Sequence, residues 1–142
     1  MSTVVDPIPG RCFCGAVRFE VTPPTLFCAH CHCSMCRRLH GAAYVTWFGV
    51  PYTGFRVLAG VADLVRYRSS DHGTRSFCRH CGSTLFCEST NHPDWIDVVL
   101  ASMERPIDRS PETHFFVDDR ADWSHFDDGL PRFGGPTGVE PR

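Results

Sequence analysis

The segment from Cys28 to Arg38 is the part of this sequence that most limits how the chain can fold. Four of the nine cysteines fall within nine residues there, and they alternate with two histidines. Neither the period of a strand nor that of a helix explains such a run, because its side chains are soft metal ligands instead of core residues. We therefore expect Cys31, Cys33 and Cys36 to hold a zinc ion whose fourth coordination position stays open.

The number and the clustering of the cysteines favour metal ligands over disulfide bonds. Nine is an odd number, so a complete disulfide framework would leave one thiol unpaired. Residues 1–10 have neither the basic region nor the apolar core of a secretion signal, which predicts a reducing, cytoplasmic location. The chain has no run of about 18 apolar residues, so we expect no membrane span.

The charged residues exclude two classes of function. All 14 basic residues are arginines, so Schiff-base catalysis through a lysine is ruled out. The formal net charge is −2, and acidic residues gather between Glu104 and Asp128. No stretch offers the basic face that phosphate backbones require, so we expect no nucleic acid partner.

The turn residues and β-formers predict a mainly β domain without long helices. The 12 glycines and 11 prolines are spread along the whole chain, as in short strands joined by turns. Residues 106–142 show no sustained period and are expected to lie as a strap over the core. Strands are expected over residues 11–21, 42–50, 84–88 and 95–103, the last of them central, with a hairpin formed by residues 55–58 and 62–68.

Two further cysteine pairs supply a second set of ligands. In the expected strand over residues 11–21, Cys12 and Cys14 point to the same side, and Gly15 permits a close backbone approach. Cys78 and Cys81 have the spacing of a zinc knuckle, in which the chain turns around the metal. The two pairs add up to the four ligands of a closed structural zinc site.

A different pairing of the cysteines stays open at this point. Cys28 and Cys31 also have knuckle spacing, so Cys28 can join the triplet in a closed four-cysteine site. The metal would then have no exchangeable position, and an enzymatic function would be disfavoured. If Cys28 and Cys87 instead pack as small hydrophobic residues, the site of the triplet remains open.

Three segments together resemble the glutathione-dependent formaldehyde-activating enzyme family, whose domain is shared with centromere protein V. The resemblance extends over residues 8–126, which leaves residues 127–142 as a C-terminal tail. The three segments are Gly10-Arg11-Cys12-Phe13-Cys14-Gly15-Ala16-Val17, Cys31-His32-Cys33-Ser34-Met35-Cys36-Arg37-Arg38 with Gly41 behind it, and Phe77-Cys78-Arg79-His80-Cys81-Gly82-Ser83.

The resemblance implies both a fold and a chemistry. It implies an Mss4-like β domain and two zinc ions. It also implies a carbon–sulfur lyase that acts on S-hydroxymethylglutathione, the adduct of glutathione and formaldehyde, with glutathione as co-substrate. The implied ligands are Cys12, Cys14, Cys78 and Cys81 for the structural zinc, and Cys31, Cys33 and Cys36 for the reactive zinc.

Two alternatives accompany this interpretation. Arg37 and Arg38 are candidates to bind a carboxylate of a peptide-like thiol substrate, or they form a solvated basic end after the metal loop. The whole domain is either the enzyme just described or a non-catalytic zinc module for protein interaction, as its relation to centromere protein V suggests.

Overall fold

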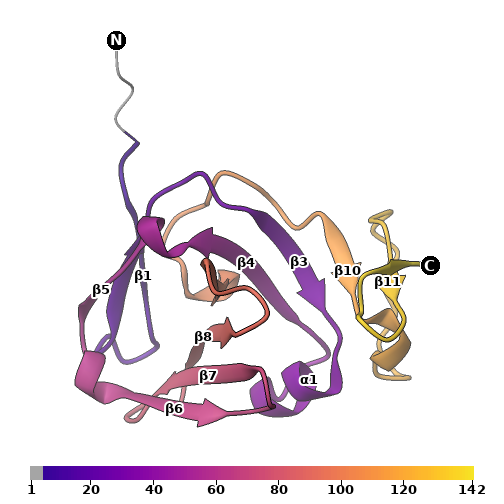
Figure 1. Cartoon of the computed structure of the whole chain (residues 1–142), viewed down its shortest axis with the longest axis horizontal. Coiled ribbons are helices and arrows are strands. Elements are labelled where there is room, and N and C mark those ends of the chain that lie inside the picture. The colour runs from indigo at the N-terminus through magenta and orange to yellow at the C-terminus, as the bar shows by residue number, and fades with distance from the viewer. Residues whose placement is uncertain (1–4) are drawn as a thin grey trace.

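The computed structural model describes residues 5–142, and its main element is a seven-stranded sheet (Figure 1). Neighbouring strands are antiparallel, except that β10 runs parallel to β3. The mainly β fold is confirmed, and β9 lies at the centre of the sheet, as expected for residues 95–103. In spatial order the strands are β10 (Thr113–Phe115), β3 (Phe27–Cys31), β4 (Val45–Pro51), β9 (Trp95–Val99), β8 (Thr84–Ser89), β7 (Gly73–Cys78) and β6 (Leu64–Arg68).

A three-stranded sheet covers one face of the large sheet, and the main core lies between the two. Its strands, in spatial order, are β1 (Ile8–Arg11), β2 (Arg18–Val21) and β5 (Phe55–Ala59). Phe19 of β2 and Phe55 of β5 both pack edge-on against Phe86 of β8, with ring centroids 4.9 and 5.0 Å apart. Fully burying such a ring contributes about 1.5–3 kcal/mol to folding, so these contacts hold the sheets together.

The single strand expected over residues 11–21 is wrong. The chain reverses between β1 and β2, which form an antiparallel hairpin that pairs Ile8 with Val21. Gly15 adopts a φ of 80°, and the amide of Cys12 donates to the carbonyl of Val17 at 3.1 Å. A strand would have carried Cys12 and Cys14 along a straight line, whereas the turn brings both sulfur atoms to one point.

The hairpin expected from residues 55–58 and 62–68 is also wrong. β5 pairs with β2, whereas β6 pairs with β7, so the two consecutive strands belong to different sheets. Gly60 makes the crossing possible: its φ is 83°, and a side chain there would run into the carbonyl group of Ala16.

Across residues 5–142 the only α-helix is α1 (Ser34–His40). The sulfur of Cys33 caps its N-terminus by accepting from the amide of Cys36 at 3.3 Å, and Gly41 ends it with a φ of 61°. Two turns are too short to produce a hydrophobic period, so the sequence did not reveal this helix. None of the described helices is long and apolar enough to cross a membrane. Short 3₁₀ helices lie at Tyr52–Gly54, Val61–Asp63, Leu100–Ser102 and Val117–Asp119.

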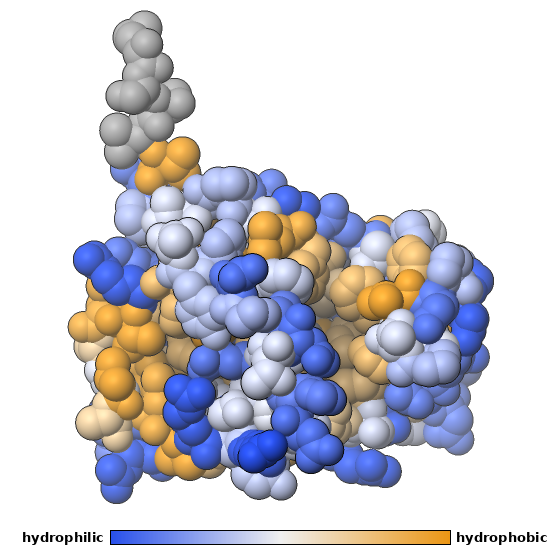
Figure 2. Space-filling view, viewed as in Figure 1, coloured by the Kyte–Doolittle hydropathy of each residue, from blue (hydrophilic) through white to orange (hydrophobic). Residues whose placement is uncertain are grey.

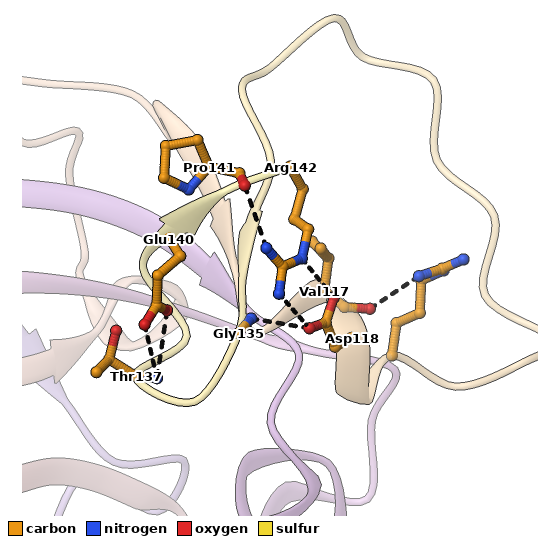
Figure 3. Close-up of polar contacts among 8 residues, drawn as sticks. Val117, Asp118, Gly135, Thr137, Glu140, Pro141 and Arg142 are labelled. Carbon is orange, nitrogen blue, oxygen red and sulfur yellow. Dashed lines mark hydrogen bonds and ion pairs between the residues drawn. The ribbon is translucent and has the colours of Figure 1, made fainter.

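Residues 106–142 contain more regular structure than the expected strap. β10 extends the large sheet, and β11 (Phe133–Gly134) pairs with β12 (Glu140–Pro141) beside it (Figure 1). The carboxylate of Asp118 accepts from the guanidinium group of Arg142 at 2.9 Å and from the amide of Gly135 at 2.8 Å (Figure 3). These contacts fold the final residues back onto the 3₁₀ helix that follows β10. The domain limits at residues 8–126 and 127–142 remain a prediction.

Candidate functional site

The face of the large sheet that is not covered by β1, β2 and β5 carries a cavity of about 640 Å³. Side chains alternate along a strand, so the register that places Phe48 and Val98 in the main core places their neighbours Trp47 and Asp97 on the cavity side. Six strands each contribute to the lining, through Phe115, Cys31, Trp47, Asp97, Cys87 and Arg75.

The C-terminal segment closes one side of this cavity. Thr137 and Val139, which lie between β11 and β12, belong to the lining together with Phe116. In the space-filling view, the surface between the sheet and the C-terminal segment is hollowed and largely hydrophobic (Figure 2). The cavity therefore offers apolar walls with a small number of polar groups, as small-molecule sites usually do.

The first cysteine cluster lies in the wall of the cavity, where β3 passes into α1. Cys31 is the last residue of β3, Cys33 caps the helix, and Cys36 belongs to its first turn. The three sulfur atoms lie within 4.8 Å of one another, and those of Cys31 and Cys36 are 3.5 Å apart. The strand-to-helix turn thus gathers the triplet that the sequence predicted.

The sulfur of Cys36 is the most polarised group of the triplet. It accepts from the indole N–H of Trp47 at 3.4 Å and from the two terminal nitrogens of Arg75 at 3.5 and 3.6 Å. Hydrogen bonding with Cys31 and Cys33, followed by the charge of Arg75, lowers the pKa of Cys36 to about 2, and this outweighs the opposing effect of burial. Hydrogen bonds with Cys33 and Cys36, together with burial, raise the pKa of Cys31 well above its ordinary value. The cluster therefore holds a thiolate that is ready to bind a soft cation.

The geometry of the triplet fits a zinc ion with three protein ligands. Zinc–sulfur bonds of about 2.3 Å in a tetrahedron place neighbouring sulfur atoms about 3.8 Å apart. Among residues 5–142, no fourth cysteine, histidine or carboxylate atom lies within 4.8 Å of all three sulfur atoms. Cys28, which was the alternative fourth ligand, is fully buried in the main core between the sheets.

The second cluster joins the β1–β2 turn to the turn after β7. The sulfur of Cys14 lies 3.6 Å from that of Cys12 and 3.8 Å from that of Cys78, and all four sulfur atoms, including that of Cys81, lie within 4.8 Å of one another. The Ser83 hydroxyl, 3.2 Å from the sulfur of Cys81, is the main cause that lowers the pKa of this thiol to about 5. These distances match the edges of a tetrahedral zinc site with four thiolates.

The positive charge inside the cavity comes from Arg75, which the sequence did not single out. Arg75 is only 5% exposed, and it stands on β7 opposite Cys87. Arg37 and Arg38 do not line the cavity: Arg38 is exposed, and Nε of Arg37 donates to the backbone oxygen of Asp119 at 3.1 Å. A role for these two in substrate binding remains a prediction.

A chain of hydrogen bonds that starts at a buried histidine and ends at an exposed carboxylate supports the loop of the triplet on the side away from the cavity. His32, between two of the cysteines, shares a hydrogen bond of 2.8 Å between its Nε2 and Nδ1 of His114. Nε2 of His114 donates in turn to the carboxylate of Asp128 at 2.7 Å. Both histidines are fully buried. Sequence reasoning missed His114 and Asp128, because only the parallel pairing of β10 with β3 brings His114 to the loop, where it meets Asp128.

The fold and the two clusters define a class of protein: a mainly β domain with two sets of cysteines that could hold metal ions, one of which borders a cavity. The sequence matches the family described as glutathione-dependent formaldehyde-activating enzyme over residues 7–119, and the chain belongs to this family. The resemblance inferred from the three cysteine motifs is therefore confirmed.

Known relatives agree with this assignment. A Halomonas elongata protein that carries the family's name is 27% identical over 133 residues, which cover 82% of this chain and 78% of the relative. A Schizosaccharomyces pombe protein described as an uncharacterized lyase is 30% identical over 89 residues, or 58% of each chain. A Rhodobacter sphaeroides protein of known crystal structure is 28% identical in sequence. Its structure superposes with a TM-score of 0.60, over 72% of this chain and 93% of that one.

Proposed function

We propose that this protein is a zinc-dependent carbon–sulfur lyase that acts on a thiol–aldehyde adduct such as S-hydroxymethylglutathione. One observation carries the proposal: three cysteine sulfurs converge in the wall of a cavity, and none of the described residues supplies a fourth ligand. The names of the family and of its relatives supply the substrate class. The cysteines all carry free thiols, which suits a reducing cytoplasm.

The residues around the triplet have distinct roles in this proposal. Cys31, Cys33 and Cys36 would hold a zinc ion, which favours the thiolate form of a bound substrate sulfur. Three thiolates and a divalent ion would carry one net negative charge. The guanidinium group of Arg75, 3.5 Å from the sulfur of Cys36, offsets this charge. Trp47 and Phe116 form apolar walls that exclude water from the reacting carbon.

The other predicted residues take supporting roles. Cys12, Cys14, Cys78 and Cys81 would hold a structural zinc that ties the small sheet to β7. Arg37 contacts Asp119, which lines the cavity, so Arg37 stands near the rim, where a carboxylate of glutathione could bind. Arg38, next to it on α1, could bind the second carboxylate.

The metal content and the reaction rate of matched variants test the proposal. The purified protein should contain two zinc ions and should accelerate the cleavage of S-hydroxymethylglutathione above its spontaneous rate, as followed by exchange NMR. Cys33→Ser should keep helix α1, because serine also caps helices, but should lose one zinc ion and the acceleration. Cys87→Ser, outside the triplet, is the control for zinc content and should keep both ions. Two zinc ions and full activity in Cys33→Ser would refute the assignment.

A second candidate, a zinc module for protein interaction, is favoured by Phe13. This residue lies between Cys12 and Cys14 in the surface turn and is 85% exposed. A protein partner that covers this ring would gain binding free energy by removing its apolar surface from water. Absence of any acceleration, together with zinc ions that do not exchange ligands with added thiol, would support this function instead.

A further inference from the structure

We propose that Asp97 is the general base of this reaction and that, together with the indole of Trp95, it binds the hydroxyl group of the adduct. The inference rests on the proposed function and adds the group that moves the proton. Both residues stand on β9 on the cavity side of the sheet, and His92 precedes them in the same wall.

The first observation is a pair of buried polar atoms, one a hydrogen-bond acceptor and the other a donor. Oδ1 of Asp97 can only accept a hydrogen bond when ionised, whereas Nε1 of Trp95 can only donate one. Both atoms are buried, and neither has a hydrogen-bond partner among residues 5–142. A hydroxyl group donates one hydrogen bond and also accepts one, so a single substrate hydroxyl could satisfy both atoms.

The second observation is that the imidazole of His92 stands beside Asp97 in a fixed orientation. Nδ1 of His92 lies 3.2 Å from the carbonyl oxygen of Trp95, which can only accept, so Nδ1 carries a proton. The imidazole stacks flat on the indole of Trp95, with ring centroids 4.3 Å apart. The stacking places Nε2 of His92 at 3.6 Å from Oδ2 of Asp97, close enough for the two residues to share a proton.

The charges around Asp97 suit a base that works near neutral pH. Burial raises the pKa of Asp97 to about 6, against the lowering effects of the charge of His92, the nearby indole of Trp95 and the charge of Arg75. Cys87 stands opposite Asp97 in the sheet, and burial raises its pKa to about 12, so it faces Asp97 as a neutral thiol. Tyr52 is neutral as well, with a pKa raised to about 12, mainly by burial. A base is most effective when its pKa lies near the working pH.

The proposed step balances without an oxidant or a reductant. The carboxylate of Asp97 takes the proton of the S–CH₂–OH hydroxyl, and the O–H electron pair becomes the second bond between carbon and oxygen. The carbon–sulfur bond breaks, and its electron pair leaves with the sulfur as a thiolate. The products are formaldehyde, the thiolate released from the adduct and protonated Asp97. In the reverse direction, protonated Asp97 returns the proton to oxygen while the thiolate adds to carbon.

The decisive variant is Asp97→Asn, with Asp94→Asn as a matched control on the exposed residue that precedes Trp95. With both zinc sites loaded, Asp97→Asn should slow adduct cleavage by about 100-fold or more. The wild-type acceleration should fall as the pH is lowered through about 6, and this fall should be absent from whatever activity the Asp97→Asn variant retains. Asp94→Asn should keep both the rate and the pH profile.

A binding measurement gives a readout that does not depend on turnover. Isothermal titration calorimetry would compare S-(2-hydroxyethyl)glutathione with S-propylglutathione, in which a methyl group replaces the hydroxyl. The wild-type protein should prefer the hydroxyl compound by about 10-fold, and Asp97→Asn and Trp95→Phe should each lose this preference. Trp95→Phe removes the donor but keeps a ring for stacking, so it also serves if Asp97→Asn does not fold.

The outcomes separate this inference from the proposed function. A wild-type protein that leaves the spontaneous rate unchanged overturns the proposed function and, with it, the catalytic role of Asp97. A wild-type protein that accelerates cleavage, combined with a fully active Asp97→Asn of unchanged metal content, overturns only the role of Asp97. Equal affinity of the wild-type protein for the two thioethers overturns the hydroxyl subsite.

Discussion

The guanidinium group of Arg75 lies against the sulfur of Cys36, with its two terminal nitrogens at 3.5 and 3.6 Å. Both residues are buried, and they come from β7 and α1, 39 positions apart in the chain. Arginine stays charged at every physiological pH, so in this position it favours the ionised form of the cluster. Arg75 therefore lets a strand of the large sheet stabilise the negative charge of the cysteine triplet.

Arg75→Met should weaken the reactive site without unfolding the protein. With the charge gone, the pKa of Cys36 in the metal-free protein should rise, as measured by the ultraviolet absorbance of the thiolate. Zinc affinity at the triplet should fall by about 10- to 100-fold, the usual effect of losing a group that supports the ligands. Arg66→Met, on an exposed arginine of the neighbouring strand, is the control. Unchanged zinc affinity in Arg75→Met would contradict this role.

Cys81→Ser should destabilise the fold far more than a change at a cysteine outside both clusters. A structural zinc site contributes on the order of 10 kcal/mol to folding, so loss of a ligand should lower the Tm by about 10 °C or more. Cys87→Ala provides the comparison, because Cys87 belongs to neither cluster. Thermal unfolding followed by circular dichroism, with and without a chelator, measures both variants. Similar Tm values for the two would show that the four-cysteine cluster does not support the fold.

His40 should make the protein less stable in weak acid. Its ring lies edge-on to Trp47, with centroids 5.5 Å apart, and burial, followed by the charge of Arg75, lowers its pKa to about 4. Unfolding returns the pKa to its ordinary value of 6.5, so the unfolded state binds more protons between these two values. Stability is therefore lost as the pH falls from 6.5 towards 4, by about 1.4 kcal/mol per pH unit.

Urea unfolding of the zinc-loaded protein at pH 7 and pH 5 measures this effect. His40→Gln should show a smaller loss of stability between the two pH values than the wild-type protein. The exposed His72 provides the control, His72→Gln, which should retain the wild-type dependence. If His40→Gln and the wild-type protein lost the same stability, the proton would be taken up elsewhere.

Asp128→Ala should loosen the loop between Cys31 and Cys33. The carboxylate of Asp128 accepts a hydrogen bond from His114 at 2.7 Å, and His114 is hydrogen-bonded to His32 at 2.8 Å. The change therefore removes the outer end of this chain of hydrogen bonds. The cost in unfolding free energy should be about 1 kcal/mol, the net value of one hydrogen bond. Zinc affinity at the triplet, measured against a competing chelator, should fall by about 10-fold. Asp127→Ala, on the exposed neighbour, should change neither quantity.

Local patterns in the sequence predicted much of this protein. The spacing of the cysteines is a local property, so it predicted the triplet and the two pairs, with Cys28 left open as a fourth partner of the triplet. The structure brings the sulfur atoms of the triplet together and joins the two pairs. Runs of β-formers predicted β4, β8 and the central β9. The strand expected over residues 11–21 was wrong because β-formers on either side of Gly15 hid the reversal at that glycine. The hairpin of β5 and β6 was wrong because a β-former pattern does not say which strand is the partner.

The sequence by itself determined the candidate metal ligands, their spacing and the β class of the fold, because these depend on residues close together in the chain. Only the tertiary structure decided which residues surround the triplet. Arg75, Asp97 and His114 stand on strands β7, β9 and β10, and their alternation defines two faces without saying which face turns to the cavity. The pairing of the strands settles that choice through long-range contacts, and it assembles the cavity from six strands around the cysteines that the sequence had already identified.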